Sequence, residues 1–200
     1  MSLTTHLVVT RWTRGQLRIW RVALLALSLF AIGAAPAVAS EPAPDRSTAR
    51  FEIDFMQDMI DHHAMAVMMA QMCLDKAVHA ELRSLCESIK TSQSQEIQLM
   101  QSWLQSWYGV SHQPGTKDTG QMKQLERASG AEFEIRFMEM MIRHHRAASK
   151  EAETCLDRAY HPELRGLCQN IIETQSAEIQ QLETWLCQWY GRCDGRRRAS

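Results

Sequence analysis

The chain contains an internal duplication. Residues 51–109 align without a gap with residues 133–191, and 32 of the 59 aligned positions are identical. A repeat of this length predicts two copies of one supersecondary unit, which bury their apolar faces against each other. The two copies are therefore expected to have the same fold, and the positions at which they differ show where their local structure or chemistry differs.

Each copy has the sequence pattern of two long helices. Apolar residues recur at steps of three and four, and the alternation that is typical of strands is absent. Pro162 is expected at the start of the last helix, while Gly109 and Gly191 are expected to end the second helix of their copies. Because one hairpin cannot bury its apolar stripe alone, we expect two tandem helical hairpins in an all-α four-helix bundle.

The regions outside the two copies are expected to be a leader, two linkers and a tail. Residues 1–39 combine four arginines, an apolar run and a small-x-small motif that ends at Ala39, as in a cleavable signal peptide. An uncleaved membrane anchor is the alternative, although the run is short for a bilayer span. Residues 40–50 and 110–132 are predicted as linkers and residues 192–200 as a basic tail. Cleavage would leave a periplasmic or secreted protein without stable membrane insertion.

The six cysteines occur in three pairs, and the duplication indicates which cysteines belong together. One pair flanks the predicted turn of the first copy, the second repeats that placement, and the third lies at the end of the last helix. In an oxidising compartment such pairs favour disulfides, with thiolate ligation of a metal as the alternative. The expected bridges are Cys73–Cys86, Cys155–Cys168 and Cys187–Cys193.

The first expected bridge sets the register of its hairpin. If Cys73 faces Cys86, antiparallel residues whose numbers sum to 159 lie level, so His63 lies level with Glu96, and Gln93 belongs to the same polar layer. Polar groups inside an apolar stripe are costly unless they are paired or bound to metal. We expect these Glu and Gln side chains to orient imidazoles rather than bind metal. The equivalent residues of the second copy are His145, Glu178 and Gln175.

A Met-x-x-His-His motif occurs once in each copy. On a helix this spacing places a thioether beside two imidazoles. Thioether and imidazole ligands suit copper, especially Cu(I), whereas iron-binding bundles place Glu where Met stands here. Other transition metals are the alternative. The predicted metal ligands are Met56, Met59, His62, His63 and Met69 in the first copy, and Met138, Met141, His144 and His145 in the second.

The same residues also have a purely structural interpretation. A methionine stripe at helical spacing is typical of core packing, and a histidine beside a buried glutamate can be a satisfied core pair. Two copies of the motif favour metal binding over this alternative. His79 and His161 are predicted as helix-start or surface residues. Packing at the ends of the bundle is expected for four tryptophans, Trp103, Trp107, Trp185 and Trp189.

The motifs together resemble a known family. The phrase F-M-x-x-M-I-x-H-H, followed by a Q-x-x-E-I helix that ends W-L-x-x-W-Y-G, is similar to the domain of unknown function 305 family in both copies. The resemblance implies a ferritin-like helical bundle, mostly in exported bacterial proteins, some of which bind copper in the periplasm. The family pattern H-H-x-x-A-x-x-M falls on His62, His63, Ala66 and Met69, and the second copy has Glu151 at the last position.

These observations favour a binding protein over an enzyme. The formal net charge of −1 argues against a nucleic-acid partner, and the sequence has no recognisable triad, catalytic cysteine or phosphate-binding loop. We expect a metal ion as the partner and copper binding, homeostasis or resistance as the function. The alternatives are a ferritin-like metallo-oxidoreductase and a metal-free structural or partner-binding bundle.

Overall fold

A computed structural model describes residues 41–115 and 120–193 of the chain. The predicted leader at 1–39 lies outside the described residues, as does most of the predicted tail. The described part contains five α-helices and no strand, which confirms the all-α fold. None of these five helices combines the length and the apolarity that a bilayer span requires.

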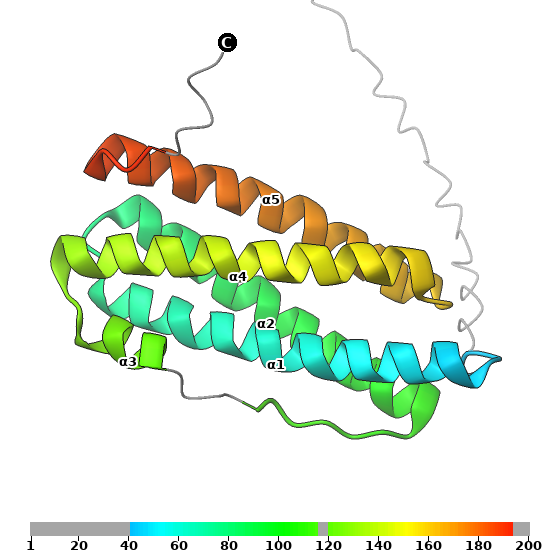
Figure 1. Cartoon of the computed structure of the whole chain (residues 1–200). Coiled ribbons are helices and arrows are strands. Elements are labelled where there is room, and N and C mark those ends of the chain that lie inside the picture. Colours follow the sequence, from blue (N-terminus) through cyan, green and yellow to red (C-terminus); the bar gives the residue numbers. More distant parts are fainter. Residues whose placement is uncertain (1–40, 116–119, 194–200) are drawn as a thin grey trace, which may run out of the picture. The chain divides into compact units, whose positions relative to one another are not determined.

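The two copies form two helical hairpins. The first pairs α1 with α2, the second pairs α4 with α5, and α1 also packs against α4. Figure 1 shows α4 lying between α1 and α5, with the short helix α3 ahead of α4 in the chain. The helices are α1 (Arg46–Lys76), α2 (Ala80–Tyr108), α3 (Gly120–Arg127), α4 (Gly130–Arg158) and α5 (Pro162–Tyr190).

Capping residues set the ends of these helices. Asp45 accepts hydrogen bonds from the backbone N–H groups of Ser47 and Thr48, so α1 begins inside the segment expected to be a linker. The predicted helix ends at Gly109 and Gly191 are confirmed, because both glycines have the left-handed backbone that closes a helix. The linker expected at 110–132 likewise contains α3 and the start of α4.

The three expected disulfides are present in the structure. Cys73–Cys86 and Cys155–Cys168 each join the two helices of one hairpin beside its turn, with Cα atoms 6.2 Å apart in both cases. All four of these cysteines are fully buried. The third bridge, between Cys187 and Cys193, closes a short loop at the end of α5.

The core consists of two clusters that are related by the duplication. In one cluster, the second half of α1 packs against the first half of α4, so Met69 and Cys73 lie with Phe133 and Phe137. In the other, the first half of α1 packs against the second half of α4. The two helices therefore run antiparallel, and the midpoint of their contact lies at equivalent positions of the two copies.

Candidate metal centre

His62 and His144 meet at the midpoint of α1 and α4. Their ring centroids are 3.6 Å apart with an interplanar angle of 34°, and Nε2 of His144 donates a hydrogen bond of 3.1 Å to the backbone carbonyl of His62. These two residues occupy the same position of the two copies. The sequence predicted one site in each copy, whereas the structure brings the two His-His pairs together between the hairpins.

The other histidine of each pair points toward a carboxylate of its own hairpin. His63 Nε2 lies 2.7 Å from Glu96 Oε2 in a hydrogen bond, as the disulfide register predicts. His145 Nε2 and Glu178 Oε2 are also 2.7 Å apart, but this pair is not aligned as a hydrogen bond. Because a carboxylate can only accept, Nε2 of His63 carries the proton in its hydrogen bond, and the lone pair of this ring remains on Nδ1.

The four Nδ1 atoms of this centre are available as ligands. In His62, His63, His144 and His145, Nδ1 is buried and has no hydrogen-bond partner among the described residues. Buried polar atoms are normally paired, and an unpaired one is costly. Metal-binding histidines commonly use one ring nitrogen for the metal while the other donates to a carboxylate or a carbonyl. Two of the four rings have the corresponding arrangement, since His63 donates to a carboxylate and His144 to a carbonyl.

The central imidazoles are held in the neutral form. Burial lowers the pKa of His62 to about 4, and the nearby His63 and His145 lower it further. Burial and the neighbouring His62 lower the pKa of His144 to about 2. Both rings are therefore uncharged at neutral pH and can bind a cation without first losing a proton.

Buried methionines precede or follow the histidines along the same two helices. Met59 and Met141 lie one turn before His63 and His145, and each is fully buried in one of the two core clusters. The remaining predicted thioether ligands are also buried, namely Met56, Met69 and Met138. Within residues 41–115 and 120–193, no three His, Cys, Asp or Glu side chains are grouped so as to hold a metal ion by themselves.

The predicted polar layer is present in both hairpins. Gln93 and Gln175 are buried, and the amide oxygen of each has no hydrogen-bond partner among the described residues. Glu96 accepts a second hydrogen bond, of 3.3 Å, from the side-chain amide of Asn170 on α5. Glu96 thus connects His63 to the other hairpin.

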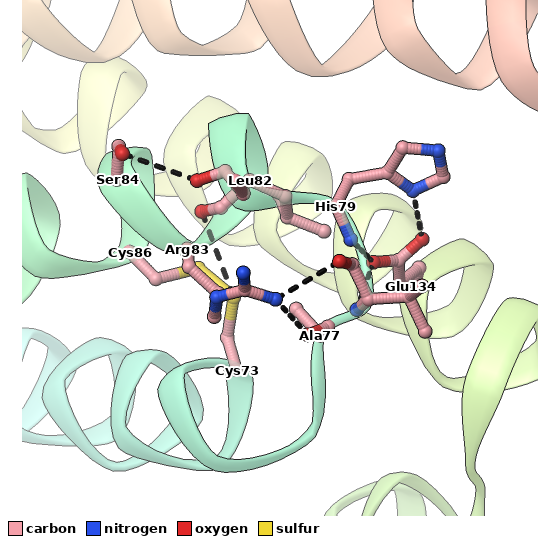
Figure 2. Close-up of a disulfide and its surroundings, with 10 residues drawn as sticks. Cys73, Ala77, His79, Leu82, Arg83, Ser84, Cys86 and Glu134 are labelled. Atoms are coloured by element: carbon pink, nitrogen blue, oxygen red, sulfur yellow. Dashed lines mark hydrogen bonds and ion pairs between the residues drawn. A yellow bond between two sulfur atoms is a disulfide. The ribbon is translucent and has the colours of Figure 1, made fainter.

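A buried carboxylate that the sequence interpretation missed closes each end of the bundle. Glu134 on α4 accepts hydrogen bonds from the backbone N–H groups of Val78 and His79 at 2.6 and 2.8 Å, and from Nδ1 of His79 at 2.7 Å. Figure 2 shows this carboxylate at the turn between α1 and α2, next to the first disulfide. Tyr190 also donates to Glu134. Burial raises the pKa of Glu134, but these donors outweigh it and the pKa is lowered overall.

The equivalent glutamate of the first hairpin, Glu52 on α1, makes the same contacts with the turn of the second hairpin. Glu52 accepts from the backbone N–H groups of Tyr160 and His161 at 2.6 and 2.9 Å, and from Nδ1 of His161 at 2.6 Å. The hydroxyl of Tyr108 donates to the same carboxylate at 2.5 Å. Each hairpin therefore closes the turn of the other, and we refer to Glu52 with His161 and Glu134 with His79 as the two carboxylate clamps.

The turn histidines are helix-start residues, which is one of the two predicted alternatives. His79 and His161 are the N-cap residues of α2 and α5, and His161 is only 3% exposed. Trp189 stacks on His79 and Trp107 on His161, with ring centroids 3.9 and 3.8 Å apart. The sequence signal for the clamps was a glutamate between two apolar residues at the same position of both copies, Glu52 and Glu134.

Comparisons with known proteins agree with this architecture. The profile of the family described as Domain of unknown function (DUF305) matches residues 52–186. CopM in its Cu(I)-bound form is 35% identical to this chain, with a TM-score of 0.65 over 70% of this chain and 98% of CopM. CopM in its Cu(II)-bound form is 33% identical, with a TM-score of 0.64 over 70% of this chain and 97% of CopM.

A third structure extends the comparison beyond CopM. A DUF305 fragment from Deinococcus radiodurans is 28% identical, with a TM-score of 0.61 over 73% of this chain and 97% of the fragment. Among curated protein sequences, none matches this chain. The family match covers both hairpins and agrees with the resemblance in the motifs. The chain belongs to the DUF305 family.

Proposed function

We propose that this protein binds copper, preferentially Cu(I), at a centre shared by its two hairpins. The observation that carries the proposal is the set of four buried Nδ1 atoms without hydrogen-bond partners, contributed by His62, His63, His144 and His145. Neutral imidazoles and buried thioethers form a soft to borderline donor set, which suits Cu(I) better than Mg²⁺, Ca²⁺ or Mn²⁺. The likeness to CopM, whose structure is known in a Cu(I)-bound form, supports copper as the metal.

The outer carboxylates orient the ligands in this proposal. Glu96 fixes the ring of His63 through Nε2 and leaves Nδ1 for the metal. Glu96→Gln keeps the shape of the side chain but removes its charge, so Cu(I) affinity should fall by about 10–100-fold. Glu87→Gln, an exposed position on the same helix, is the matched control and should leave the affinity unchanged.

The direct test is a competition titration of the metal-free protein with its disulfides intact. The protein should withdraw Cu(I) from a chelator such as bicinchoninate, and the His63→Gln, His145→Gln double variant should not. His112→Gln is the control, because His112 is hydrogen-bonded to Asp61 and is not one of the four central histidines. Circular dichroism verifies that each variant is helical. Undiminished Cu(I) binding by a variant lacking all four central histidines would disprove the site.

We propose that the protein works in the periplasm or outside the cell, after removal of the leader at 1–39. The three disulfides support this location, because such bridges persist in oxidising compartments. N-terminal sequencing of the exported protein should begin just after Ala39. An intact N-terminus on the protein recovered from the membrane fraction would contradict cleavage.

A further inference from the structure

A second group of methionines, which are not part of the Met-x-x-His-His motifs, lies where α1, α3 and α4 meet. Met69 on α1 and Met122 on α3 are 1% and 5% exposed, and both belong to one hydrophobic core cluster. Met72 on α1 and Met140 on α4 are half-buried and pack against the same cluster. We call these four residues the methionine junction, because their thioethers come from three helices.

The short helix α3 is fixed in this place by contacts with the core and with α1. Its buried residues are Met122 and Leu125, which are three positions apart and therefore share one face of the helix. The ammonium group of Lys76, at the end of α1, donates hydrogen bonds to the backbone carbonyls of Glu126 and Ala128. These contacts hold Met122 against the core cluster that the other three methionines contact.

The duplication shows that the junction positions of α1 and α4 lie close together. Their counterparts in the other half of the molecule all line one cavity of about 410 Å³, formed by α1 and α4. The counterparts of Met69, Met72 and Met140 are Glu151, Thr154 and Asp58, in that order. Burial raises the pKa of Glu151, and the neighbouring Asp58 raises it further. The same packing of α1 on α4 brings the three methionines together.

The two equivalent places have different chemistry. At the same repeat offset residues 41–45 stand where α3 stands, but they are not helical, and the cavity beside them is lined by charged side chains. Packing under α3 explains apolar residues at the junction, but leucine would provide that packing equally well. Thioether sulfur is a soft ligand that selects Cu(I). We propose that the methionine junction is a second metal site, where thioethers alone bind a soft monovalent cation such as Cu(I) or Ag(I).

The junction is separate from the central histidines and can be reached from solvent. Met69 follows His62 by seven residues, which is about 10 Å along a helix axis, so its sulfur lies nearer to Met72 than to the histidine pair. Met68 is 40% exposed and lies one turn before Met72 on α1, where it offers a thioether to an ion that arrives from solvent. The proposal therefore does not depend on copper binding by the histidines.

The site can be tested by NMR of the disulfide-intact protein labelled with [methyl-¹³C]methionine. On titration with Ag(I), which is a redox-stable probe, the ε-methyl signals of Met72 and Met140 should shift. The Met72→Leu, Met140→Leu double variant keeps the side-chain volumes and should take up less Ag(I) in equilibrium dialysis than the wild type. Met100→Leu, at a buried position of the other core cluster, is the matched control and should leave the uptake unchanged. Circular dichroism verifies that each variant is helical.

The His63→Gln, His145→Gln double variant separates this proposal from the function proposed above. Its Met72 and Met140 signals should still shift with Ag(I), whether or not the central histidines bind metal. Unchanged signals of these two methionines in the wild-type protein would overturn the proposal, and so would undiminished Ag(I) uptake by the methionine double variant. Equal shifts on titration with Zn(II) would also refute it, because a thioether site must select the softer ion.

Discussion

The imidazoles of His62 and His144, with centroids 3.6 Å apart and planes tilted by 34°, bring equivalent positions of the two copies into contact. Because each ring belongs to a different hairpin, removing one histidine should also weaken Cu(I) binding by the histidines of the other hairpin. We predict that His62→Ala and His144→Ala each remove most of the Cu(I) affinity. The double variant should then lose little more, since mutations within one site are not additive. Chelator competition with all three variants measures this. If each single variant instead lost only half of the bound Cu(I) and held the rest with unchanged affinity, the two hairpins would have independent sites.

The thioether of Met59 should distinguish soft from borderline metals. Met59→Leu keeps the volume of the side chain and removes the sulfur, so we expect it to weaken Cu(I) binding more than Zn(II) binding. Met100→Leu is the matched control, because Met100 is buried in the same cluster and has Leu182 as its counterpart in the second copy. Parallel titrations with the two metals give the comparison. Equal losses for Cu(I) and Zn(II) would remove the soft-ligand argument.

The stability of the metal-free protein should decrease toward acidic pH. The pKa values of His62 and His144 are lowered from 6.5 to about 4 and about 2, so the unfolded chain takes up protons in this range before the folded chain does. The contribution of these groups is fully present above pH 6.5 and is lost as pH falls toward their folded pKa values. Each group contributes about 1.4 kcal/mol per pH unit within its window.

Urea unfolding in the presence of a chelator, at about pH 7 and about pH 5, measures this loss. The His62→Gln, His144→Gln double variant is the comparison, since it lacks both titrating groups but retains the carboxylates. Its free energy of unfolding should change less with pH than that of the wild type. An identical change in both proteins would assign the pH dependence to other residues.

The carboxylate clamps should contribute strongly to stability. Glu134→Ala leaves the backbone N–H groups of Val78 and His79 without their acceptor, so we expect the free energy of unfolding to fall by about 3 kcal/mol. Glu132→Ala is the control, because Glu132 is exposed and its ion pair with Arg136 is solvated, and it should change stability by less than about 1 kcal/mol. Denaturant unfolding of the metal-free proteins compares them. Equal stabilities would show that other contacts hold this end of the bundle.

The features that could be predicted from the sequence are local or follow from the repeat. Helix periodicity and capping act over a few residues, so Pro162 and Gly191 mark the ends of α5 as expected. The disulfide Cys73–Cys86 then fixes how α2 lies along α1, which is why His63 and Glu96 could be paired from the sequence.

The features that could not be predicted depend on how the two hairpins meet. Nothing in one copy specifies which face of α1 contacts α4, so the close approach of His62 and His144 could not be deduced. The partner of Glu52 lies 109 residues away at His161, on the turn of the other hairpin. The local sequence gives only a weak indication of such long-range pairs, which here is a charged residue between two apolar neighbours.

The reciprocal clamps have a consequence for how this architecture can vary. A single hairpin carrying both Glu and His could satisfy these contacts only in a symmetric homodimer, where every change appears on both sides of the axis. Joining the two units in one chain removes that constraint. One half can then carry Met69 and Asp61 while the other carries Glu151 and Arg143 at the same positions. A chain of two such halves can keep the same residues at its centre and carry different side chains on its two flanks.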